Sequence, residues 1–562
     1  MKNIDNINEK VENRKKQLQP LFDKDKENYD LWVGKEQIFD THKMAINVTG
    51  TEMVALRKRC QDSIVRSRLD IHVLPPKPIE NPSAKKDANQ EERMYYHGFD
   101  KADERLSMLG EAKLKPAMAW QAITLGRVAV RVLVYYCPKR KRVIWDILPM
   151  IPRFVTFSFD SEGLDWYSYE TFRSPAAIKS EYGVDVPEDT QGKGISVSDY
   201  WDREHNVRYL TKDKEALSFQ VGGKKVTAWE HPFKEVPAII QPVAGGPKAI
   251  TSEGTDVTAW GQSVFDPIKT PFRTLNLLRS IVAHHAHLLA KTPIEAIRNE
   301  GSEERIEEQE LSFYPNSIIN HTDALTLKSL DLKDIPPSIL TMMGDISTSI
   351  QRVTGADLHP EWAGSSGAAL RIAGQDRQDV NTPIVDTLNT AYTRICRMVK
   401  GEVVTQKLEI PVQIVVNGEY SVFDIAPKQL DNDFYVNAEL VRRDVYDEES
   451  QLQRAQMLMQ LRLKSREDIM EQEMNEQDVP TQIMKMDMEE IEAAIPEMKL
   501  RRLIKDLQRE FDDLMEQDIE DKDLGDKIKM MKEQLGMLVT QKQQALMGGG
   551  QPQGGVPPGA PR

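Results

Sequence analysis

The first feature of this sequence that could carry chemistry is a group of three histidines, His284, His285 and His287. They fall in a segment of helical periodicity, where His284 and His287 share a face and His285 points about 100° away. No Cys, Asp or Glu follows at the spacing of a metal site. We therefore expect structural histidines and no bound metal.

Phosphate-binding loops and reactive cysteines are the next features to test. The segments Gln191–Ser196 and Val221–Thr227 combine glycine with lysine, but neither has the GxxxxGK[ST] spacing with which backbone amides cradle phosphate. Both favour ordinary turns. The cysteines lie far apart with no CxxC pair, which is typical of reduced thiols. These patterns predict no cofactor.

Acidic residues cluster at Glu303–Glu310 and at Glu489 and Glu490. No nucleophile or base partner accompanies them, so a solvated or docking surface is favoured over paired catalytic carboxylates. We expect no catalytic residues and no enzymatic activity. The alternative is an enzyme whose site is assembled from Asp, Glu and His scattered through residues 41–265.

Charge and hydropathy restrict the class of protein. The 562 residues include 74 basic and 88 acidic ones, a net charge of −14, which argues against a protein that wraps nucleic acid with a basic surface. At about 150 residues per domain, the length predicts roughly three or four structural units. No segment approaches the roughly 18–20 apolar residues that cross a bilayer, and the N-terminus lacks the apolar core of a signal peptide. A globular protein without membrane contact is expected.

The first half of the chain predicts an α+β body. Residues 1–40 are highly charged with helical spacing and suggest an accessory surface arm. In the body, Val128, Val130, Val132 and Val134 alternate as one face of a strand. The basic run 139–142 then predicts a hairpin turn before a partner strand at 143–148.

Long helices dominate the second half. Asp266 and Pro267 predict the N-cap and first turn of a helix that reaches about residue 291. A small α+β insert with strands at 294–298 and 317–320 follows, and a second helix begins at Pro336. After a Gly/Ser-rich loop, a third helix carries Pro383, which should bend it. Closing strands, an acidic helical region and a Gly/Pro-rich tail complete the chain.

This order of segments resembles the portal proteins of tailed bacteriophages. The residues that carry the resemblance are Trp120–Tyr136 (WQAITLGRVAVRVLVYY), Arg173–Gly183, Glu235–Ile240 and Gly364–Leu370 before the bent helix. The resemblance covers most of residues 40–440. It divides the chain into a helical arm (1–40), wing (41–265), first stem helix (266–292), clip (293–335), second stem helix (336–355), tunnel loop (356–367), kinked wing helix with closing strands (368–440), helical crown (441–547) and disordered tail (548–562).

The resemblance implies a ring, expected as a dodecamer, at one capsid vertex of the virion, assembled in the host cytoplasm. Double-stranded DNA would pass through it without sequence readout during packaging and ejection. Implied partners are the terminase large subunit, the major capsid protein and head-completion or tail adaptor proteins. The implied sites are the tunnel loop with His359, Glu361, Trp362, Ser365 and Ser366, the channel-lining stem residues Arg273, Arg279 and Arg352, and the clip docking surface with Glu303, Glu304, Glu307 and Glu308.

A second interpretation is compatible with the same sequence. The helical region 441–547 alone would suit another oligomeric virion scaffold or adaptor without a DNA channel. A central channel in the assembled protein distinguishes the two interpretations.

Overall fold

The structure of the chain is a computed structural model that divides into two compact units, Met1–Ile414 with Tyr420–Arg443, and Val415–Glu419 with Asp444–Arg562. The fold below is that of the first unit. The described residues are 4–35, 46–76, 82–138, 140–187, 194–221, 224–245, 250–251, 254–255, 257–290, 294–298, 325–329, 334–353, 367–416, 419–441, 455–461 and the single residues 469, 486, 530 and 533.

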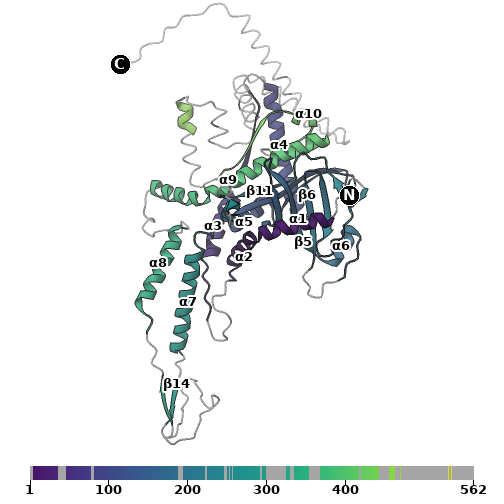
Figure 1. Cartoon of the computed structure of the whole chain (residues 1–562). Coiled ribbons are helices and arrows are strands. Elements are labelled where there is room, and N and C mark those ends of the chain that lie inside the picture. Colours follow the sequence, from purple (N-terminus) through teal and green to yellow (C-terminus); the bar gives the residue numbers. More distant parts are fainter. Residues whose placement is uncertain are drawn as a thin grey trace, which may run out of the picture. The chain divides into compact units, whose positions relative to one another are not determined.

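Helices and strands are mixed along the chain, often in runs of one kind (Figure 1). The helices are α1 (Ile4–Gln17), α2 (Gln19–Val33), α3 (Glu52–Arg66), α4 (Pro82–Met108), α5 (Leu114–Leu125), α6 (Pro175–Tyr182), α7 (Lys269–Ala290), α8 (Pro337–Val353), α9 (Gly367–Gln406), α10 (Pro427–Leu430) and the 3-10 turns η1 (Pro152–Phe154) and η2 (Val257–Trp260). The strands are β1 (Arg68–Leu74), β2 (Arg127–Cys137), β3 (Arg142–Pro149), β4 (Val155–Phe159), β5 (Leu164–Arg173), β6 (Ile195–Asp202), β7 (His205–Leu210), β8 (Phe219–Val221), β9 (Lys224–Val226), β10 (Ala228–Glu230), β11 (Ala238–Pro242), β12 (Ile250–Thr251), β13 (Gly254–Thr255), β14 (Ile294–Arg298), β15 (Leu325–Ser329), β16 (Ile410–Val416), β17 (Glu419–Ile425) and β18 (Tyr435–Val441).

Two sheets form the body, one ordered β11-β2-β3 and the other β10-β7-β6-β5-β4. Their strand pairs are antiparallel, so the expected mixed α+β class with antiparallel pairing is confirmed for the described residues. The predicted hairpin of β2 and β3 is present, with Val134 opposite Trp145. β18 pairs with β1, which confirms that the late strands close the body begun near the N-terminus.

Helix α5 lies at the centre of the larger core and contacts α2, α3, α4, α9, β2 and β3. Most of its side chains are apolar and buried, as expected of a helix inside a core. Gly126 ends it with φ +71°, and a Cβ there would lie 2.6 Å from the backbone carbon of Gln262. Glycine is required because the conformation is left-handed and another backbone packs against it.

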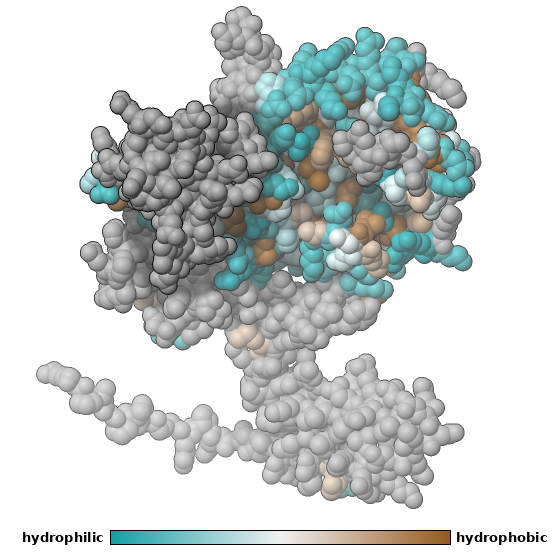
Figure 2. Space-filling model, turned by 90° about the horizontal axis from the view of Figure 1, so that it is seen from below, coloured by the Kyte–Doolittle hydropathy of each residue, from teal (hydrophilic) through white to brown (hydrophobic). Residues whose placement is uncertain are grey.

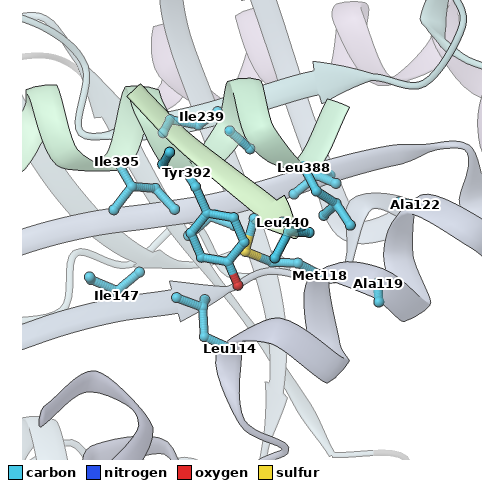
Figure 3. Packing of buried hydrophobic residues seen from close by; sticks show 14 of the residues in the cluster. Leu114, Met118, Ala119, Ala122, Ile147, Ile239, Leu388, Tyr392, Ile395 and Leu440 are labelled. Atoms are coloured by element: carbon cyan, nitrogen blue, oxygen red, sulfur yellow. The ribbon is translucent and has the colours of Figure 1, made fainter. Parts of the chain in front are cut away.

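The core continues through α9, which crosses the sheet that contains β2. Figure 3 shows Tyr392 of α9 reaching into apolar side chains contributed by α5, β3, β11 and β18. Buried residues of α9 recur at Leu388, Tyr392, Ile395 and Val399, as helical periodicity predicts. The helix continues through Pro383, whose carbonyl accepts a hydrogen bond from the Thr387 hydroxyl.

The two N-terminal helices, α1 and α2, pack against this body. Ile7 and Val11 of α1 pack in a cluster with Trp166, on the five-stranded sheet. In α2, Asp25 forms a fully buried ion pair with Arg127, whose Nη1 donates to Oδ1 at 2.9 Å. Such a pair tolerates the loss of neither partner, because the remaining charge would be buried alone.

Two side chains of α9 complete the hydrogen bonding of β2. The partner strand β11 begins at Ala238, opposite Arg131, so the backbone of Val134 has no residue of β11 beside it. The Val134 N–H donates to Glu402, and Gln406 donates to the Val134 carbonyl at 2.6 Å. Burial raises the pKa of Glu402 well above its usual value. Burial therefore favours the protonated form of this carboxyl.

The Glu402→Gln variant tests this interpretation. A folded-state pKa above the unfolded value makes wild-type stability fall as pH rises above about 4.5. Glutamine keeps the hydrogen-bond acceptor but has no ionisable group. The thermal midpoint of the variant, relative to that of the wild type, should therefore rise between about pH 5 and pH 8. A difference that does not change with pH would contradict a raised pKa of Glu402. Glu409→Gln, at an exposed position close by in sequence, is the matched control.

Candidate functional site

Helices α7 and α8 contact each other and are rooted in the body at only one end (Figure 1). Phe272 and Leu275, near the start of α7, are buried in the main core, and so is Ile350, near the end of α8. Further along α7, Val282 and His285 are half-buried. The pair therefore leaves the core, and the antiparallel strands β14 and β15 follow α7 and precede α8.

The start of α7 differs from the sequence prediction. The helix begins at Lys269, not with an N-cap at Asp266. The Asp266 carboxylate instead accepts a hydrogen bond from the Ser263 N–H at 2.8 Å and pairs with Lys24 of α2, also at 2.8 Å. Because the turn and the lysine occupy the carboxylate, it is not available as a helix cap. α2 thereby holds the base of α7.

A short extended segment, residues 46–50, lies along α7. Gly50 N–H donates to Asn276 Oδ1, and Val48 N–H donates to Ser280 Oγ, both at 2.9 Å. Asn276 and Ser280 are one helical turn apart and fully buried. The segment is thus attached to one stripe of α7 through its own backbone.

An ion pair reinforces this attachment. Arg279 Nη2 lies 2.6 Å from the carboxylate of Glu52, the first residue of α3. Burial opposes ionisation of Glu52, but the hydrogen bond from Arg279 holds its pKa below the usual value. α3 and α7 are therefore tied at the point where α7 leaves the core.

Large apolar side chains are exposed on the outer faces of both helices. On α7, Leu277 and Ile281 continue the stripe of Arg273 at intervals of four residues. On α8, Leu340 and Met342 are about half exposed. Exposed apolar side chains on a helix pair that projects from a body are typical of a contact surface.

The structure describes the side chains of two of the three predicted stem arginines. Arg273 is exposed on α7, and Arg279 pairs with Glu52. Arg352 lies in α8, and its side chain is outside the described residues. The positive charge of Arg279 is therefore compensated within its own chain.

The other predicted site residues lie outside the described residues. These are the tunnel-loop residues His359, Glu361, Trp362, Ser365 and Ser366 and the clip residues Glu303, Glu304, Glu307 and Glu308. The described elements on either side of them are β14 and β15 around the clip and α8 and α9 around the loop. The predicted strand at 294–298 is confirmed as β14, and the one at 317–320 is also outside the described residues.

Sequence reasoning missed an ionic network between the two sheets of the body. Arg131 of β2 donates to Asp146 of β3 at 2.8 Å and to Asp199 of β6 at 3.1 Å. Arg105 of α4 donates to Asp146 at 2.9 Å. Burial alone would raise the pKa of Asp146, but the two arginines hold it below the usual value. No local motif indicates these pairs, because the partners come from separate elements.

The described part of the chain was also searched for metal sites, disulfides and membrane-spanning helices. It holds no group of His, Cys, Asp and Glu that could bind a metal ion. Cys60, Cys137 and Cys396 form no disulfide, and Cys60 and Cys396 are buried. None of its helices is both long enough and apolar enough to span a membrane.

Comparison with known proteins yields little. No family model and no curated protein matches this sequence. A chain in the structure titled "Virion of native gene transfer agent (GTA) particle" is similar, with 11% identity and a TM-score of 0.33 over 73% of this chain and 85% of that chain. Both values are too low to assign a function.

The Asn276→Ala/Ser280→Ala double variant should free the 46–50 segment from α7. Each side chain supplies a buried hydrogen bond to that segment's backbone, so amide exchange at Val48 and Gly50 should accelerate about tenfold or more. Hydrogen exchange followed by mass spectrometry measures this. Thr274→Ala, which removes a hydroxyl that bonds only within α7, is the control. Unchanged exchange in the double variant would show that other contacts hold the segment.

Proposed function

We propose that this chain is the portal subunit of a tailed-phage head: a non-enzymatic ring at the capsid vertex through which DNA is packaged and ejected. The observation that supports the proposal is the order of the elements α7, β14, β15 and α8. Two helices rooted in one core enclose a β-ribbon, and a long helix then returns to that core. This is the stem and clip order on which the sequence resemblance rests. The match of TM-score 0.33 adds nothing to it.

The helix pair suits the wall of a channel. α-Helices are stiff, and the 22 residues of α7 extend about 33 Å. The 46–50 segment, the Arg279–Glu52 pair and the Lys24–Asp266 pair hold α7 against the body. A wall that must stay in place while a duplex slides past it needs such anchoring.

Exposed apolar residues on α7 and α8 support a ring. Leu277 and Ile281 would be covered by the neighbouring subunit's helices, because several exposed apolar side chains on one helix pair are unfavourable in water. The exposed Arg273 on the same stripe would provide a local phosphate contact. Because the chain has a net charge of −14, DNA would bind weakly to the rest of its surface.

The remaining assignments follow from the same proposal. The tunnel loop around Trp362 would contact the DNA backbone without reading sequence. The acidic clip, with Glu303 to Glu308, would dock the terminase large subunit during packaging and head-completion or tail adaptors afterwards. The wing would meet the major capsid protein. The protein would thus reside at the portal vertex of the virion.

Negative-stain electron microscopy with mass photometry of the purified chain tests the ring directly. The expected result is a particle with a central hole and a mass of about 770 kDa, for a dodecamer of 64.1 kDa chains. Leu277→Ser/Ile281→Ser should lower the ring fraction, because it removes apolar contact area between neighbouring helices. Thr270→Ser, a mild change at another exposed position of α7, is the control.

A persistent monomer or dimer, even with crowding agent and capsid protein added, would contradict the portal proposal. A large assembly without a central channel would favour the alternative of a virion scaffold or adaptor. ATP or substrate turnover by the purified chain would instead revive an enzymatic role.

The tunnel-loop prediction concerns function after assembly. The His359→Ala/Trp362→Ala variant should form rings with normal mass but lower the yield of DNA-filled heads at least about tenfold, because it removes the proposed DNA contacts. Packaged genomes are counted as nuclease-resistant DNA. Val422→Ser, an exposed change on β17, is the control. Full genome retention by the loop variant would contradict a role of this loop in the channel.

A further inference from the structure

The interface between helices α2 and α5 contains buried polar atoms that have no hydrogen-bond partner among the described residues. Both amide atoms of Asn28, Nδ2 and Oδ1, are of this kind, and so is the hydroxyl oxygen of Thr124. Hydrophilic side chains at the surface, which cover much of the face shown in Figure 2, can bond to bulk water. Asn28 and Thr124 cannot, because neither residue has any exposed surface.

Unpaired polar atoms at such depth are unusual in a folded protein. Removing an amide or a hydroxyl from water without a new hydrogen bond destabilises the folded state, so the great majority of buried polar groups have a partner. Here three atoms of two residues in one interface share the same deficit. This points to one small ligand that serves both residues.

Two contacts between α2 and the α5 region fix the position of this site. At one end, Asp25 of α2 pairs with Arg127, which follows α5, and Arg127 Nη1 donates to Asp25 Oδ1 at 2.9 Å. At the other end, Trp32 of α2 packs edge to face on Trp120 of α5, with ring centroids 5.6 Å apart. The later residue of α2 meets the earlier residue of α5, so the two helices run in opposite directions along this interface.

The two unpaired side chains lie between these contacts. Asn28 is three residues after the aspartate of α2 and four before its tryptophan, which puts all three on one helix face. Thr124 is four residues after the tryptophan of α5 and three before the arginine. Both side chains are short, whereas the contacts on either side are made by long ones. The long side chains therefore set the spacing of the helices, and Asn28 and Thr124 do not bond to each other.

The unpaired atoms determine which ligand fits. Asn28 Nδ2 can only donate a hydrogen bond, Asn28 Oδ1 can only accept one, and the Thr124 hydroxyl can do either. A metal cation cannot accept from the amide N–H groups, and an anion without protons cannot donate to the amide oxygen. Water does both, and a buried water typically makes about three hydrogen bonds.

We propose that an ordered water molecule is bound between α2 and α5 and bridges the Asn28 amide and the Thr124 hydroxyl. The site lies inside one chain and does not depend on the proposed portal function. It attaches α2 to the helix at the centre of the main core. Because Lys24 of α2 also pairs with Asp266 before α7, the bound water helps to hold the base of the stem.

A crystal structure or cryo-EM map of the full chain at about 2 Å resolution tests the site directly. The expected result is a density peak about 2.7–3.2 Å from both an amide atom of Asn28 and the hydroxyl of Thr124. A direct hydrogen bond between the two side chains, or no peak between them, would overturn the proposal.

Variants test whether the water holds α2 in place. Thr124→Val keeps the shape of the side chain but removes the hydroxyl, so amide exchange in the peptides of α2 should accelerate about tenfold. Asn28→Leu/Thr124→Val should exchange within about threefold of wild type, because both polar partners of the water are then apolar and the leucine takes its place. Thr341→Val, whose hydroxyl bonds to the Pro337 carbonyl within α8, is the control.

Each outcome bears on the water or on the portal proposal separately. Unchanged exchange of α2 in Thr124→Val would contradict a water that holds this helix. A density peak that persists in Asn28→Leu/Thr124→Val would show that other groups bind the water, and would overturn its assignment to these two residues. Rings without the peak would overturn this inference alone, whereas the peak in a chain that stays monomeric would support it and count against the portal. If a variant does not fold, the wild-type map decides.

Discussion

Strand β2 must be covered on both faces and both edges, and much of the body is arranged to do this. Its valines, such as Val130 and Val132, enter the main core, while Ala129 and Leu133 on the opposite face enter the second cluster. A strand buried in this way has no access to water for its backbone groups. Each N–H and carbonyl left by the neighbouring strands therefore needs a partner from the protein.

Polar side chains supply those partners at defined places. Gln121 of α5 accepts a hydrogen bond from the Ala129 N–H, and Glu402 and Gln406 of α9 serve Val134. Asp25 of α2 neutralises Arg127, and Asp146 and Asp199 neutralise Arg131. The N-terminal helices and α9, distant in sequence, are thus held to one strand by groups that would be costly to leave unpaired.

The same body provides the base for α7 and α8. Their inner ends share the main core with β2 and α9, and α2 and the 46–50 segment hold the start of α7 from the side. Beyond this base the two helices expose apolar side chains, among them Leu277, Ile281 and Leu340. Apolar side chains that stay exposed beyond a buried core are typical of contact surfaces.

Sequence periodicity by itself determined the secondary structure that is set locally. The alternating valines of β2, the start of α8 at Pro337 and the apolar spacing of α9 could all be read without a fold, because side-chain direction repeats with a period of two in strands and 3.6 in helices. The stem and clip order, on which the proposed function rests, came from the same patterns.

Tertiary structure alone decided which distant groups meet. Asp25 and Arg127 are 102 residues apart, and Glu402 and Val134 are 268 residues apart, so no local pattern links them. It also decided that Asp266 bonds to a turn and a lysine of α2 instead of capping α7, and that α1 and α2 pack against the body. The physical reason is that the energy of an ion pair or hydrogen bond depends on burial and on its partner's position, which exist only once the chain has folded.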